Sequence, residues 1–94
     1  MRDFKVGDTL KWVGGEGFQD KDTQKYFAWF YNAGRHELFV GDVCTVTEAE
    51  ELNFSVFVWR HRLHAKMFSQ PTPLDSRRYG LSPWVLATEE TENA

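Results

Sequence analysis

The sequence predicts a mainly β domain: a small barrel of about five strands with one short helix inserted between the first two strands. Three observations lead to this fold class. A motif of an apolar residue, Gly and Asp, followed by alternating apolar positions, occurs twice. A later stretch is rich in β-branched and aromatic residues, and helix-boundary residues flank a segment between the two motifs. Aromatic residues make up 16% of the chain, which is enough ring area to close one small core.

The duplicated motif covers residues 4–12 and 38–46, at an offset of 34 residues. Glycine tolerates a positive φ, and an aspartate side chain can accept hydrogen bonds from nearby backbone N–H groups. Each Gly–Asp pair, Gly7–Asp8 and Gly41–Asp42, therefore predicts a tight bend that leads into a strand.

Three further elements follow from the second half of the chain. Residues 54–59 predict a central strand because both of its faces are apolar, and residues 50–53 supply the turn of a hairpin with a strand at 43–47. After a polar stretch that leads into a partner strand, residues 70–79 predict a loop because they contain two prolines. Residues 82–87 predict a turn and a short closing strand.

The segment 22–33 predicts the inserted helix. Asp22 at its start and Gly34 after its end are helix-boundary signals. The apolar side chains follow the helical spacing i, i+3, i+4, i+7: Tyr26, Trp29, Phe30 and Ala33. A strand is the alternative, because so many aromatic residues favour extended structure.

Residues 1–88 are expected to form a single domain, and residues 89–94 an acidic tail that frays. The chain has one cysteine, Cys44, so an internal disulfide is excluded and a reducing cytoplasm is the expected location. Neither a secretory signal nor an apolar run of about 18 residues is visible, so no membrane partner is expected.

Catalytic and metal-binding chemistry has no support in the sequence. Cys44 lies on the expected inward face of a strand, and no serine lies in a nucleophile-elbow motif. His61 and His64 would point to opposite sides of a strand, so they cannot chelate one ion together. We therefore expect no catalytic residues, no metal, no cofactor and no small-molecule substrate.

The strand-entry motifs at 4–13 and 38–59, with the closing segment 82–90, resemble small uncharacterised bacteriophage accessory proteins with an SH3-like β-barrel. The resemblance covers less than half of the chain. It implies an SH3-like barrel and a protein that acts in the cytoplasm of a bacterial host. It also implies a non-enzymatic role, in which the chain binds and inhibits or otherwise modulates a host protein.

The aromatic cluster at 26–31 is the first candidate for binding such a partner. On a helix, Phe27 and Tyr31 would lie outside the apolar face, so the cluster supplies either core alone or core plus an interface. Trp and Arg residues dominate the binding energy of many interfaces. The expected partner contacts are Phe27, Tyr31, Trp59 and Arg62.

The alternative partner is nucleic acid, bound by a basic arm over residues 60–78. The arm has five cationic side chains: Arg60, Arg62, Lys66, Arg77 and Arg78. Strand alternation would place the first three on one face and Trp59 on the other, which separates the cations from the ring that could stack a base. The net charge of −3 also argues against this role, and a solvated strand end paired with nearby acids is the simpler interpretation.

Overall fold

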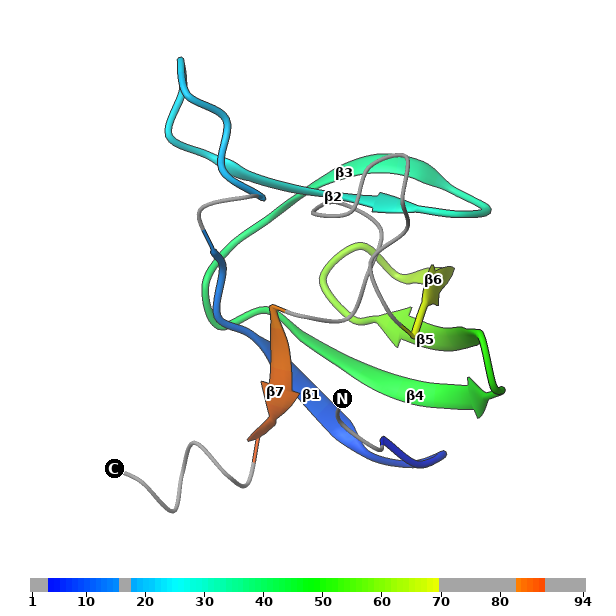
Figure 1. The fold of residues 1–94 in the computed structure, drawn as a ribbon. Helices are drawn as coiled ribbons and strands as arrows, with labels where there is room; N and C mark the ends of the chain where they lie inside the picture. Colours follow the sequence, from blue (N-terminus) through cyan, green and yellow to red (C-terminus); the bar gives the residue numbers. More distant parts are fainter. Residues whose placement is uncertain (1–3, 16–17, 70–82, 88–94) are drawn as a thin grey trace.

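The computed structural model describes residues 4–15, 18–69 and 83–87. Within these residues the chain forms seven strands and none of the expected helix (Figure 1). The strands are β1 (Thr9–Trp12), β2 (Tyr26–Phe30), β3 (Gly34–Leu38), β4 (Val43–Ala49), β5 (Asn53–Val58), β6 (Leu63–Phe68) and β7 (Trp84–Leu86). The prediction of a mainly β protein is therefore confirmed.

Five strands form one antiparallel sheet in the order β6-β5-β4-β1-β7, and β2 pairs with β3 in a separate two-stranded sheet. The β2–β3 hairpin lies opposite β1 and β4, across the space that the larger sheet curls around (Figure 1). No strand ladder among the described residues joins the two sheets. The expected closed barrel is therefore not seen.

The turn of the hairpin is fastened to the edge of β6. The Tyr31 backbone N–H donates to the Lys66 carbonyl oxygen at 2.8 Å. The Asn32 side chain accepts from the Lys66 N–H at 2.7 Å and donates to the His64 carbonyl oxygen at 3.4 Å. These bonds satisfy edge groups that would otherwise be open to pairing with another chain.

The core lies between the two sheets and takes side chains from both. Trp12 and Trp84, which are paired across β1 and β7, pack edge to face with ring centroids 5.1 Å apart. Ala28, Phe30 and Leu38 close the core from the side of the hairpin. Edge-to-face packing of large rings adds about 0.5–1.5 kcal/mol to the free energy gained by burying them.

The two copies of the strand-entry motif form the same turn, as predicted. Gly7 and Gly41 have φ of +95° and +99°. The carboxylate of Asp8 accepts from the backbone N–H three residues earlier at 2.8 Å, and that of Asp42 does so at 2.9 Å. The copies face each other across the antiparallel pair of β1 and β4. Residues at equivalent positions of the motif, Leu10 and Cys44, are paired at its centre.

The predicted helix at 22–33 is wrong, because this segment contains a turn followed by β2. The Asp20 carboxylate accepts from the N–H and the hydroxyl of Thr23, both at 2.9 Å, and these bonds lower the pKa of Asp20. Gln24 then takes a φ of +65°, which a helix cannot accommodate. Ala28 and Phe30 are buried while their neighbours are half-buried, so the segment does alternate. Rings on both faces conceal this alternation in the sequence.

The other predicted elements agree with the structure where it describes them. Strand β5 is central, between β4 and β6, and forms the expected hairpin with β4. Strand β7 is the short closing strand. The expected loop at 70–79 and the expected tail at 89–94 lie outside the described residues.

We predict that Gly41→Ala and Gly7→Ala each lower the free energy of unfolding by about 1–2 kcal/mol. An added Cβ would meet no atom within 4 Å at either site, so the cost is the positive φ alone. Urea unfolding measures this change. Val40→Ala and Val6→Ala, exposed neighbours in the same turns, are the controls and should change stability much less. An unchanged stability of the glycine variants would show that the turns tolerate another conformation.

We also predict that Cys44 weakens the fold at alkaline pH. Burial raises the pKa of its thiol far above 9.0, so the folded protein keeps a proton that the unfolded chain releases. Stability should therefore fall between pH 8 and pH 10, by about 1.4 kcal/mol more than in Cys44→Ala. Urea unfolding at the two pH values tests this, and equal falls in both proteins would contradict it.

Candidate partner-binding site

Two of the four predicted partner contacts lie on the small hairpin. Phe27 is a half-buried residue of β2, and the Arg35 guanidinium lies 3.7 Å from the centre of its ring. Tyr31 is exposed in the hairpin turn and packs edge to face with Phe68 at 5.3 Å. Both rings are partly accessible, but each is engaged by a neighbouring side chain.

The other two predicted contacts lie together in the turn between β5 and β6. Trp59 is 55% exposed, and its indole N–H donates to the Thr45 hydroxyl at 2.9 Å. The Phe57 ring packs edge to face with the indole, with ring centroids 4.8 Å apart, and this contact fixes the indole further. Arg62 follows at φ +50° and donates its N–H to the Trp59 carbonyl oxygen. The four predicted residues thus divide between two places.

Phe39, which was not among the predicted contacts, lies against Arg60, a residue of the same turn as Trp59 and Arg62. It begins the turn between β3 and β4, and its side chain is 51% exposed. The next residue, Val40, is 63% exposed. The N–H of Trp59 donates to the carbonyl oxygen of Val43, so the two turns lie side by side. We call residues 39–42 and 59–62 the turn end.

Arg60 joins the two turns of the turn end. Its guanidinium lies 4.1 Å from the centre of the Phe39 ring, a cation–π geometry. Its Nε donates to both carboxylate oxygens of Asp42, at 3.0 and 3.1 Å, and Nη2 donates to one of them at 3.0 Å. Nη2 also donates to the Glu37 carbonyl oxygen at 2.9 Å. These bonds therefore hold the guanidinium against one face of the Phe39 ring.

A histidine pair, His36 of β3 and His61 of the turn end, supports this arrangement. The His61 ring Nε2 lies 2.7 Å from the same Glu37 carbonyl oxygen, and the His36 Nε2 lies 3.1 Å from the Ala33 carbonyl oxygen. The two imidazole rings are 5.2 Å apart. His36 is held within the hairpin, and His61 connects the hairpin to the turn end through the Glu37 carbonyl oxygen and the His36 ring.

The residues of the predicted basic arm are not brought together. Arg60 is bound to Asp42, Arg62 lies in the turn, and Lys66 lies on the face of the larger sheet that points away from the core. Arg77 and Arg78 are outside the described residues.

The predicted placement of Trp59 and Lys66 on opposite faces of the sheet is wrong. The turn at 59–62 resets the alternation, so Trp59, Phe57, His64 and Lys66 share the outer face.

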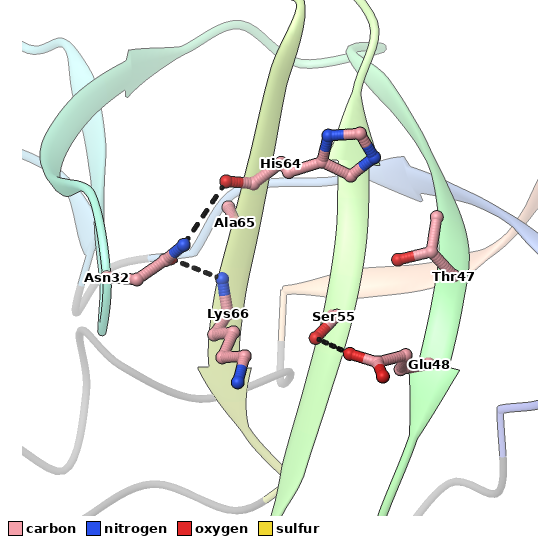
Figure 2. A pocket seen from close by; sticks show the side chains of 7 residues that line it. All are labelled: Asn32, Thr47, Glu48, Ser55, His64, Ala65 and Lys66. Carbon is pink, nitrogen blue, oxygen red and sulfur yellow. Dashed lines mark hydrogen bonds between the residues drawn. The ribbon is translucent and has the colours of Figure 1, made fainter.

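A shallow depression of about 320 Å³ lies over the outer face at β6. Its lining residues are Asn32, Thr47, Glu48, Ser55, His64, Ala65 and Lys66. Figure 2 shows the Ser55 hydroxyl donating to the Glu48 carboxylate, at 3.0 Å, and Asn32 bonded to the backbone of β6. The depression thus carries both a carboxylate and an ammonium group.

Groups with catalytic potential are sparse in the described part of the chain. Cys44 is fully buried, and burial raises the pKa of its thiol, so the nucleophilic thiolate is disfavoured. No group of three or more His, Cys, Asp and Glu side chains among the described residues is placed to hold a metal ion.

Comparison with known proteins finds no match for this chain among protein-family models, curated proteins or solved structures. No helix in the described residues is long and apolar enough to cross a membrane.

We predict that Asp42→Asn destabilises the protein by about 0.5–1 kcal/mol more than Asp8→Asn. Both variants keep an oxygen that can accept the turn hydrogen bond, but only Asp42 has an ion pair with Arg60. The estimate is modest because the Arg60 side chain is 38% exposed. Urea unfolding of the two variants makes the comparison, and equal destabilisation would show that the ion pair contributes nothing.

Proposed function

We propose that this chain is a non-enzymatic binding protein that engages a partner protein through the turn end. One observation carries the proposal: two large aromatic side chains, Phe39 and Trp59, are exposed yet held in fixed positions. Arg60 fixes Phe39, and Thr45 and Phe57 fix Trp59. An aromatic ring that stays exposed to water is unfavourable for the free energy of folding and adds nothing to the core.

Preorganisation is what makes such rings useful for binding. A flexible side chain loses about 0.5–1.5 kcal/mol of rotamer freedom when an interface immobilises it. Phe39, Trp59 and Arg60 are already constrained before a partner arrives, so this cost is reduced. Aromatic and Arg side chains are also the types enriched among residues that dominate interface energies.

The identity of the partner follows from the resemblance to phage accessory proteins. It makes a host cytoplasmic protein the expected partner and inhibition or another form of modulation the expected effect. The SH3-like architecture belongs to the same proposal. It is supported by the duplicated strand entry and by the small antiparallel sheet that the hairpin covers.

We predict that affinity pull-down from a bacterial lysate recovers a host protein in stoichiometric amount, and that Phe39→Ala or Trp59→Ala reduces its affinity by about 30-fold or more. That factor corresponds to the loss of at least about 2 kcal/mol at a dominant contact. Leu52→Ala is the matched control, because Leu52 is 70% exposed in the β4–β5 turn at the other end of β5.

Circular dichroism and urea unfolding of each variant check that the fold is intact. If no stoichiometric protein is recovered, or if Leu52→Ala weakens binding as much as Trp59→Ala does, the turn end is not the interface.

A further inference from the structure

The outer face of the larger sheet carries a row of rings that the proposed protein interface uses only at one end. In β5, Phe57 lies between two other rings: Trp59 at 4.8 Å and His64, its cross-strand partner in β6, at 5.0 Å. Both neighbours are exposed, and Phe57 is half-buried. No described strand covers this face.

Cationic side chains flank this ring row. Lys66 lies two residues beyond His64 on the same face and lines the depression of Figure 2. Lys11 of β1 shares the face through its pairing with Val43. Hydroxyl groups of Thr47 and Ser55 also line the depression, so polar and cationic groups stand directly beside the rings.

We propose that the outer face over β4, β5 and β6 binds single-stranded nucleic acid. In this arrangement bases stack on the rings of Trp59, Phe57 and His64, while a backbone phosphate lies in the depression at Lys66. Rings with accessible faces combined with cations that follow the backbone are the two requirements of a platform for unpaired bases. A duplex keeps its bases stacked inside, so it cannot use the rings.

Glu48 sets a limit on the affinity at this site. Its carboxylate lines the same depression as Lys66 and accepts a hydrogen bond from Ser55 at 3.0 Å. A phosphate at Lys66 is therefore attracted by the ammonium group and repelled by the carboxylate. With about two phosphates neutralised, by Lys66 and Lys11, binding is weak and sensitive to salt, in keeping with a chain whose net charge is −3.

The experiment is a fluorescence-anisotropy titration with fluorescein-labelled dT12, rU12 and a duplex of the same length. We expect both single strands to bind and the duplex to bind far more weakly. Between 50 and 200 mM salt, the affinity for a single strand should fall about sevenfold, from a slope of about −0.7 per neutralised phosphate. The ratio of the dT12 and rU12 affinities decides whether DNA or RNA is preferred.

Three variants separate the contributions. Phe57→Leu should weaken binding at least about fivefold with an unchanged salt slope, because it removes a stacking ring. Lys66→Gln should weaken binding and flatten the slope by about 0.7, whereas Glu48→Gln should tighten binding about two- to threefold. Lys21→Gln is the control, since Lys21 lies exposed in the turn before β2.

No binding of either single strand at 50 mM salt would overturn the inference, and so would preferential binding of the duplex. Equal effects of Lys66→Gln and Lys21→Gln would also overturn it, because Lys66 would then contribute no more to binding than a lysine outside the proposed site. Lys66 and Glu48 lie outside the turn end and take no part in fixing Phe39 or Trp59, so Lys66→Gln and Glu48→Gln should leave the pull-down of a host protein unchanged. The two proposals therefore fail separately.

Discussion

The antiparallel pair of β1 and β4 fixes the register on which the rest of the molecule depends. Its central pair, Leu10 and Cys44, points into the core. A slip of one residue would turn every inward side chain of one strand to the outside. The duplicated turns resist such a slip, because each is bonded to the opposite strand. The Gly7 N–H donates to the Val46 carbonyl oxygen, and the Gly41 N–H donates to that of Trp12, at 2.8 and 2.9 Å.

The same turn serves different purposes in its two copies. At the first position of the turn, one copy has Lys5 and the other has Phe39. Asp42 accepts the turn hydrogen bond as Asp8 does, but it also holds Arg60. The geometry that enters a strand in the first copy therefore also positions an exposed aromatic side chain in the second. The rigidity of the turn end is a consequence of the fold and needs no separate device.

Local turn chemistry explains which parts of the fold could be predicted. A Gly–Asp bend is determined by neighbouring residues, so both strand entries were predictable. The β4–β5 hairpin was predictable as well, because a short turn joins two strands that are adjacent in the sequence. The strand β2 was not predictable, because its rings on both faces hide the alternation and a turn ended by Gln24 resembles a helix start.

Half of the candidate site was predictable, since Trp59 and Arg62 have the residue types of an interface. Phe39 was hidden by its role as a strand-entry residue. The Arg60–Asp42 pair spans 18 residues, which no local pattern reveals.

Trp59 belongs to both of the proposed binding surfaces. Its backbone lies in the turn end, where its N–H donates to Val43, while its indole is tied to Thr45 and Phe57 on the outer face. A protein that buries the indole removes the terminal ring of the row from a single strand, and a stacked base removes the indole from a protein. Under the two proposals, the protein partner and the single strand would compete for this one side chain, so binding of either should weaken binding of the other by the contribution of that ring.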